Sequence, residues 1–371
     1  MTLKASAVAI ALSSVSTSAV LAGGLDRTGQ PIGVLFEEGR YVELSFGGVF
    51  PDVSGTDVAL QPTGNVGNAY FVGGAAYKAD LTDSISYALI VDQPYGASVE
   101  YGATTPVFAG TSAEASTVAV TAIGQYNFNE NFSVYGGVRA QQIKAEVGLS
   151  GAAYGPLSGY EFEGESDWGV GYVVGAAYER KDIALRVALT YSSEIDHSLP
   201  TTETLAGGGA VPGSGADTEV TSPQSVNLDF QTGIMADTLL FGSIRWVNWD
   251  GFSVAPVGLG TVSPGSTLVT YEDNTFTYNL GIGRRFTENF SAAVQVGYEE
   301  NLGGTVSALG PTNGFLSFGV GGTYTMNNGL ELTGGLRYIM PGDATVASGG
   351  GTAEFEDNNA IAAGLKIAYR F

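Results

Sequence analysis

The sequence predicts an all-β protein, a 14-stranded antiparallel transmembrane β-barrel with a short N-terminal plug segment. Three observations favour this fold. Fourteen segments alternate apolar with small or polar side chains, the links between them are alternately short and long, and only 14% of residues are charged. Alternation with a period of two is typical of strands. Soluble domains usually contain about 25% charged residues, so this chain resembles a membrane protein in composition.

The N-terminus has the pattern of an export signal. Lys4 precedes a small, apolar stretch, residues 5–21, and Val20-Leu21-Ala22 provides a small-residue cleavage site. We therefore expect residues 1–22 to be a signal peptide, the alternative being a buried helix. After this stretch no apolar run reaches the roughly 18 residues of a membrane-spanning helix. A membrane protein without such runs has a closed barrel as its remaining option.

Residues 23–40 precede the first alternating segment and contain one apolar cluster, Ile32, Val34, Leu35 and Phe36. An apolar cluster of this kind rarely stays in water, which favours a plug that folds into the barrel. The alternative is a disordered tail. The predicted organisation is a signal peptide (1–22), a plug segment (23–40) and a barrel (41–371).

The barrel segments follow one another with links that sort by length. Six short turns rich in Asn, Asp and Gly, as tight hairpins require, alternate with seven long links rich in Gly, Thr, Pro and Asp. Outer-membrane barrels have this layout, with short periplasmic turns and longer outer loops. The segments are residues 41–50, 69–78, 85–92, 117–128, 132–147, 167–179, 183–192, 225–234, 238–249, 275–286, 290–299, 314–326, 330–339 and 360–371.

The last segment shows which face meets lipid. Ile361, Leu365 and Phe371 belong to a wholly apolar face, whereas Lys366 and Arg370 lie on the opposite face. A lysine or arginine on the lipid side near the midplane would cost about 2–4 kcal/mol, so the charged face must line the lumen. We expect this strand to pair with residues 41–50 and close the barrel. Phe371 resembles the terminal aromatic residue that outer-membrane assembly machinery reads.

The same alternation places three further cations in the lumen. Arg139, Arg245 and Arg337 lie opposite the apolar face and away from the short turns. A fatty-acid carboxylate would need a buried cation, so these arginines are the candidate ligand-binding residues. The alternative is that they pair with lumen carboxylates and brace the wall, which is their expected role if the substrate is a neutral hydrocarbon.

Several short stretches resemble one family. Residues 221–252, with Trp246 and Trp249 in a W-x-x-W pair, the hairpin 273–298 and the terminal YRF are similar to the FadL family of outer-membrane channels for long-chain fatty acids and aromatic hydrocarbons. The stretch DQPYGA resembles the end of the third strand in that family. The Asn-Pro-Ala sequence usual in the family's plug is absent from residues 23–40.

This resemblance implies passive uptake of hydrophobic compounds through the outer membrane of a Gram-negative bacterium, whose lipopolysaccharide blocks such compounds. It also implies pocket capture, movement of the plug, and lateral release where the third strand is kinked, at Asp92, Gln93 and Pro94. The alternative function is a diffusion porin for small hydrophilic solutes.

Other classes of function fit the sequence poorly. A net charge of −22 disfavours nucleic acid as a partner. The single histidine, His197, lies in a predicted loop, and barrel hydrolases need a histidine base beside a nucleophile, so no enzyme is predicted. Acidic residues 161–167 do not have the spacing of a 12-residue calcium loop. We predict no metal site and no cofactor.

Overall fold

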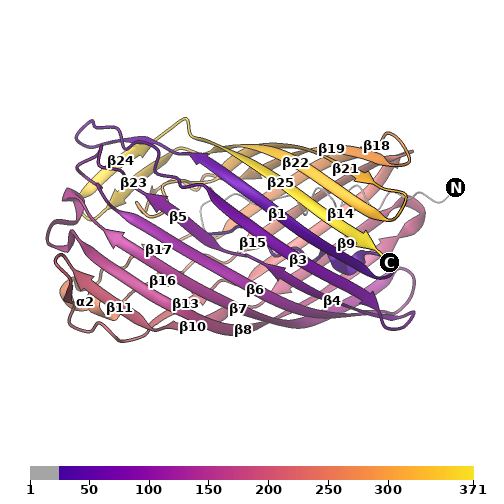
Figure 1. Cartoon of the computed structure of the whole chain (residues 1–371), viewed down its shortest axis with the longest axis horizontal. Helices are drawn as coiled ribbons and strands as arrows, with labels where there is room; N and C mark the ends of the chain where they lie inside the picture. The colour runs from indigo at the N-terminus through magenta and orange to yellow at the C-terminus, as the bar shows by residue number, and fades with distance from the viewer. Residues whose placement is uncertain (1–24) are drawn as a thin grey trace.

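Fourteen antiparallel strands form a closed barrel in the computed structural model, which describes residues 25–371 (Figure 1). The predicted signal peptide lies outside the described residues. The barrel strands are β1 (Tyr41–Asp52), β3 (Tyr70–Asp80), β4 (Ile85–Asp92), β6 (Ser112–Asn127), β7 (Phe132–Leu149), β8 (Tyr160–Arg180), β9 (Leu185–Ser192), β14 (Ser225–Met235), β15 (Thr238–Val247), β18 (Thr275–Arg285), β19 (Phe290–Glu299), β21 (Phe315–Thr325), β22 (Leu330–Pro341) and β25 (Asn359–Arg370).

The first and last strands close the barrel, as the sequence predicted. β1 and β25 pair in antiparallel register from Tyr41 opposite Arg370 to Asp52 opposite Asn359. β8 begins at Tyr160, before the predicted start at residue 167, and its first residues pair with β7. The outward side chains there include Glu161 and Glu163. The strand therefore continues beyond the part whose outward side chains are apolar, and apolar alternation alone does not predict its first residues.

Side-chain exposure divides each strand into two faces. Outward side chains such as Val170 (71% exposed), Phe318 (50%) and Leu280 (52%) form an apolar band around the barrel. Inward side chains are mostly buried, and they include the cations Arg139 and Lys366. Arg139 and Lys366 therefore lie on the lumen side of their strands. No helix in residues 25–371 is long and apolar enough to cross a membrane.

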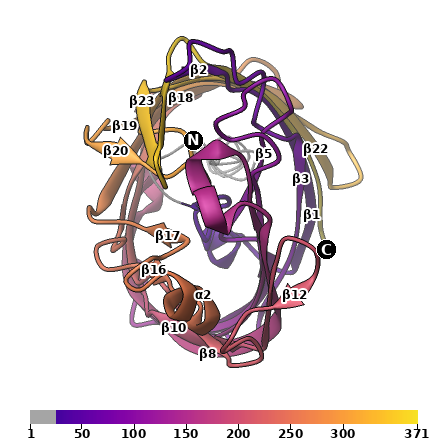
Figure 2. The ribbon, with the colours of Figure 1, turned by 90° about the vertical axis from the view of Figure 1, so that its left-hand side faces the viewer.

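The long links gather at one end of the barrel, here called the loop end, and the short turns lie at the other, the turn end (Figure 1). β2, β24, β23 and β20 form a small separate sheet there, with β20 and β23 parallel (Figure 2). The loop-end elements are β2 (Gly55–Asp57), β5 (Gly96–Glu100), η2 (Ala152–Leu157), β10 (Ile195–Leu199), β11 (Thr201–Leu205), β12 (Gly209–Ala210), β13 (Thr218–Ser222), β16 (Ser253–Val254), α2 (Val257–Val262), β17 (Val269–Thr270), β20 (Thr305–Val306), β23 (Ala344–Ser348) and β24 (Gly351–Phe355); η3 (Lys181–Ile183) lies at the turn end.

The terminal residue contributes little to packing. Phe371 is 69% exposed, and its ring contacts only Tyr369 among the recorded aromatic pairs of the described chain. Deleting Phe371 should leave the folded barrel stable but lower severalfold the amount that reaches the outer membrane. Gel mobility of unheated outer-membrane fractions measures the folded amount, with Phe371→Tyr as the aromatic control. Normal membrane levels of the deletion variant would contradict a recognition role.

Candidate functional site

The N-terminal segment, residues 25–40, lies inside the barrel. Its short helix η1 (Gly33–Phe36) carries part of the apolar cluster predicted to form the plug, and Ile32, Val34 and Leu35 are 3%, 5% and 1% exposed. They pack against lumen side chains of eight barrel strands, including Tyr41, Ala76, Ala88, Ile123, Tyr135, Val173, Ala188 and Ala368. Burial of these side chains supplies the hydrophobic driving force that holds the segment in the lumen.

Arg245 holds this segment through an ion pair in the middle of the lumen. Its Nε and Nη2 donate to the two carboxylate oxygens of Asp26, at 2.5 and 3.1 Å. Its Nη1 donates to Asn227 Oδ1 at 2.8 Å and to Gln30 Oε1 at 3.3 Å. Ser225 Oγ also donates to Gln30, at 2.8 Å. We call these five residues the Arg245 latch. At its centre is a bidentate Arg245–Asp26 ion pair that is shielded from water.

A second set of contacts holds the segment near the turn end. Arg370 Nη2 donates to Glu37 Oε2 at 2.5 Å, which ties the segment to the last barrel strand. The Phe36 ring lies edge-on to Tyr135, with centroids 6.0 Å apart, and the Arg186 guanidinium lies 4.6 Å from its centre. The segment is thus held near both of its ends. Arg370 contributes by pairing with Glu37, which is a structural role.

The barrel wall is interrupted beside the start of this segment. The pairing of β3 with β4 ends at Ala75 opposite Val91, and pairing of the two chain stretches resumes at Gly67 opposite Val99. Between these points the third strand is broken at residues 93–95, separating β4 from β5. The sequence placed a kink at Asp92, Gln93 and Pro94, and the structure has a strand interruption at these positions. We call this feature the wall break.

The N-terminal segment occupies the free edge at the wall break. Asp26 and Tyr95 form an antiparallel bridge, with Arg27 N donating to Pro94 O at 2.7 Å and Gly96 N donating to Leu25 O at 2.8 Å. The Arg27 guanidinium lies over Gly96, where any Cβ would come within 2.4 Å of Arg27 Cζ. Glycine at position 96 is therefore required for the segment to approach this closely.

Side chains fill the remaining gap in the wall. The Arg27 guanidinium stacks 4.3 Å from the ring centre of Tyr70, a residue of β3. Gln93 Oε1 accepts a hydrogen bond from Gly73 N at 3.1 Å and so replaces a backbone partner that the broken strand does not provide. The wall break is thus closed by the side chains of Arg27, Tyr70 and Gln93 instead of by a continuous ladder of backbone hydrogen bonds.

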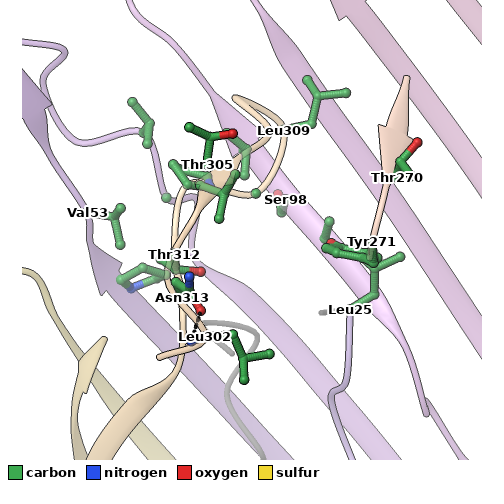
Figure 3. Close-up of a pocket in the computed structure, with 18 of the residues that line it drawn as sticks. Leu25, Val53, Ser98, Thr270, Tyr271, Leu302, Thr305, Leu309, Thr312 and Asn313 are labelled. Atoms are coloured by element: carbon green, nitrogen blue, oxygen red, sulfur yellow. Dashed lines mark hydrogen bonds between the residues drawn. The ribbon is translucent and has the colours of Figure 1, made fainter. Parts of the chain in front are cut away.

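A cavity of about 390 Å³ lies among the loops of the loop end (Figure 3), and its lining includes Leu25, Tyr70 and Ala97, which border the wall break. Its apolar lining includes Leu25, Val53, Tyr271, Leu302 and Leu309. Among the described residues that line it, two are acidic, Glu272 and Asp273, and none is lysine, arginine or histidine. This volume falls in the range of small-molecule sites, roughly 300–1,000 Å³.

Aromatic side chains form the wall next to this cavity. Trp249, 1% exposed, packs against Tyr95, Phe252 and Tyr271, with ring centroids 5.2 to 5.5 Å apart. Burial raises the pKa of Tyr271, so its hydroxyl stays neutral at physiological pH. Tyr95 belongs to the wall break, and Tyr271 lines the cavity, so the two features share one aromatic cluster.

A buried carboxylate fixes the loop beside the cavity. Glu203, fully buried, accepts hydrogen bonds from Gly258 N at 2.7 Å, Leu259 N at 2.6 Å and Tyr160 OH at 2.6 Å. Hydrogen bonds to charged groups contribute about 1.5–3 kcal/mol each. Glu203→Leu should therefore raise amide hydrogen exchange in residues 253–270 by at least tenfold, while exchange in the barrel strands stays constant. Unchanged exchange in this loop would show that its apolar packing alone holds it.

The comparisons with known proteins identify the family. The model for the outer membrane protein transport family (OMPP1/FadL/TodX) matches residues 38–371. The chain belongs to this family. A search of curated proteins found no match. The solved structures that resemble this FadL/TodX-family chain share its fold at low sequence identity.

Three of these structures illustrate the similarity. A FadL homologue from Pseudomonas aeruginosa is 16% identical, with a TM-score of 0.74, covering 96% of this chain and 98% of that one. The toluene transporter TbuX of Ralstonia pickettii is 15% identical, with a TM-score of 0.63 and 92% coverage of both chains. The toluene transporter TodX of P. putida is 14% identical, with a TM-score of 0.65, covering 90% of this chain and 91% of that one.

Family membership places this FadL/TodX-family protein in the bacterial outer membrane, as predicted, with the short turns on the periplasmic side. The structure places all three candidate arginines in the lumen at one height. Arg139, Arg245 and Arg337 are each the eighth residue of a strand that rises from the turn end, β7, β15 and β22. None of the three lines the 390 Å³ cavity.

The partners of the three arginines differ. Arg139 donates to Thr121 Oγ1 at 2.9 Å and Ser192 Oγ at 3.2 Å, whereas Arg245 binds Asp26. Arg337 is 8% exposed, and its Nη2 has no hydrogen-bond partner among the described residues. Their role as ligand-binding residues stays a prediction. Alternation in the strands locates such side chains, but it says nothing about the loops, so sequence reasoning missed Arg27, Asp26, Tyr271 and the cavity.

Proposed function

We propose that this protein carries small, neutral hydrophobic compounds across the outer membrane, capturing them in the 390 Å³ cavity and releasing them through the wall break into the bilayer. The observation that carries the proposal is the contact between the two features. Leu25, Tyr70 and Ala97 line the cavity, and they lie on the segment and strands that border the wall break. A compound that leaves the cavity on this side therefore reaches the wall break directly.

The charge of the cavity favours neutral substrates over fatty acids. Glu272 and Asp273 are the charged residues among its described lining, and both would repel a carboxylate. A fatty acid would require a cation at the cavity, whereas the lumen arginines lie elsewhere. The transporters TbuX and TodX, which share the fold, are described as toluene transporters, which supports a monoaromatic hydrocarbon as the substrate class.

The lipid side of the wall break suits lateral release. Phe50, Phe71 and Val91 surround it and are 48%, 73% and 38% exposed on the outer face. A hydrophobic compound crossing between Arg27 and Tyr70 would therefore enter an apolar environment directly. Release requires the Arg27 side chain to leave the gap, and the N-terminal segment that carries it is the element expected to move.

Uptake of labelled toluene and labelled oleate by cells with and without the protein tests this function. We expect the protein to raise toluene uptake severalfold and oleate uptake little. Val306→Trp, which fills the cavity, should abolish the gain. Val58→Trp is the matched control, since Val58 is 65% exposed and does not line the cavity. Equal uptake of both compounds with and without the protein would refute the proposal.

The diffusion-porin alternative makes a different prediction. A porin gives a steady, large current in a planar bilayer, whereas a barrel with residues 25–40 in its lumen should be almost silent. We therefore expect near silence from the wild-type protein. A steady open current would favour the porin.

A further inference from the structure

The lumen has two chemically different halves. The N-terminal segment packs its apolar side chains against β1, β3, β4, β6, β7, β8, β9 and β25. In the opposite half, from β14 to β19, most inward side chains are polar apart from the buried cluster Leu239, Phe241 and Ala293, and this half borders a second cavity of about 110 Å³ beside the segment. The barrel wall lines it with the polar side chains Asn227, Asp229, Gln231, Ser243, Thr277, Asn279 and Gln295, and the apolar side chains Ile32, Phe36, Phe230 and Phe241 also line it. A cavity of this size lined by polar groups holds water.

Unsatisfied polar atoms in this half also indicate water. The Oδ1 atom of Asn279 is buried and has no hydrogen-bond partner among the described residues. Arg337 Nη2 is in the same situation. A Cβ at position 319 would lie 3.8 Å from both Arg337 Nε and Gln295 Cβ, so the Arg337 side chain extends over β21 towards the side of the lumen formed by β19. Buried polar atoms of this kind are normally satisfied, here by water or a small solute.

Charge is distributed unevenly at the height of the three arginines. Asp92 is the eighth residue of β4, so Asp92, Arg139, Arg245 and Arg337 form one level, which we call the arginine tier. The wall contributes three positive charges and one negative charge to this tier. The further negative charge that reaches it, Asp26, belongs to the N-terminal segment.

The charges on neighbouring levels are more nearly balanced. Below the tier, Arg186 faces Asp229 and Glu179. Nearer the turn end, Lys366 pairs with Glu43 at 3.2 Å, and Arg370 lies near Glu37 and Glu331. Towards the loop end, the carboxylate of Glu299 accepts a hydrogen bond from Thr277. The arginine tier is therefore the level at which the wall carries excess positive charge.

We propose that the polar half of the lumen is a second, aqueous route, closed by residues 25–40 and selective for small inorganic anions at the arginine tier. When the segment leaves the lumen, Asp26 leaves with it, and three arginines then face one aspartate. This positive ring attracts anions even though the protein as a whole carries a net charge of −22. The route runs along the barrel axis and is separate from the path of hydrophobic compounds through the wall break.

Planar-bilayer recordings in a potassium chloride gradient test this route. We expect short, rare openings from the wild-type protein, longer ones from Asp26→Asn, and a continuous current from a variant lacking residues 25–36. The reversal potential of the open state should show a preference for chloride. Each arginine removed from the tier should lower the chloride-to-potassium permeability ratio by up to about 30-fold, because a unit charge about 4 Å away in water changes the Boltzmann factor of each ion about fivefold and in opposite directions.

Arg337→Gln in the shortened barrel is the decisive variant, because removing this side chain breaks no hydrogen bond recorded in the described chain. Arg180→Gln, an equal change of charge at an exposed turn, is the control and should leave selectivity unchanged. A shortened barrel that does not conduct, or one that prefers potassium, would overturn the proposal, as would equal selectivity in both variants. If the deletion variant does not fold, the openings of Asp26→Asn with and without Arg337→Gln give the same comparison. Toluene uptake reports separately on the hydrophobic path.

Discussion

Replacing Arg245 with methionine is expected to release the N-terminal segment from the lumen. The Arg245–Asp26 ion pair is almost fully buried, and both residues are hydrogen-bonded within the latch. Removing one partner of a buried pair costs about 3–5 kcal/mol because the other charge remains uncompensated. Amide hydrogen exchange in residues 25–36 should therefore accelerate by roughly two to three orders of magnitude, while the barrel strands keep their protection.

A double variant separates the charge effect from lost packing. In Arg245→Met with Asp26→Leu no charge is left unpaired, so the segment should regain much of its protection. Arg285→Met, which removes an arginine paired with Asp237 at the turn end, is the control for loss of a lumen arginine. Equal exchange rates in Arg245→Met and the wild-type protein would show that the apolar packing of η1 alone retains the segment.

A disulfide between positions 26 and 95 is expected to abolish toluene uptake under oxidising conditions. Asp26 and Tyr95 are antiparallel partners flanked by two backbone hydrogen bonds, an arrangement with Cα atoms about 4.5 Å apart. This spacing suits a disulfide, and the natural chain has no cysteine to interfere. The crosslink would fix Arg27 in the wall break, and a reductant should restore uptake within the same sample.

The control crosslink joins the two strands that close the barrel. Val42 and Tyr369 are partners on β1 and β25, so a disulfide between them leaves the N-terminal segment free. It should form under the same conditions and leave uptake unchanged. Mass spectrometry confirms each crosslink. Normal uptake by a fully crosslinked 26–95 variant would mean that hydrophobic compounds do not leave through the wall break.

The barrel was predictable from the sequence because the side chains that face lipid follow a pattern between near neighbours in the chain. Lipid requires an apolar side chain at every second position, so alternation located the strands, the lumen cations and the closing pair of β1 with β25. The apolar cluster Ile32, Val34, Leu35 and Phe36 was recognisable for a similar reason, since four such side chains need a buried surface. The interruption of the third strand coincides with Pro94, which cannot donate to a ladder.

The cavity and the latch were not predictable because they depend on contacts between distant residues. Arg245 and Asp26 are 219 positions apart, and no periodicity links them. Alternation identified Arg245 as a lumen cation, but the nearest carboxylate belongs to a segment whose path the sequence did not reveal. The cavity is assembled from loops such as 51–69 and 300–314, whose glycine-rich sequences carry no repeating pattern.

The closing pair of strands has a mechanical consequence for the barrel. β2, which follows β1, pairs with β24, which precedes β25, so the two strands are clamped together at the loop end. At the turn end the Glu37–Arg370 contact clamps the same pair from inside the lumen. Neighbouring strands elsewhere are joined by short turns or by long ladders. Under lateral pressure from the bilayer, the barrel wall should deform little where β1 pairs with β25. It should deform most at the wall break, where the side chains of Gln93 and Arg27 replace backbone hydrogen bonds between strands.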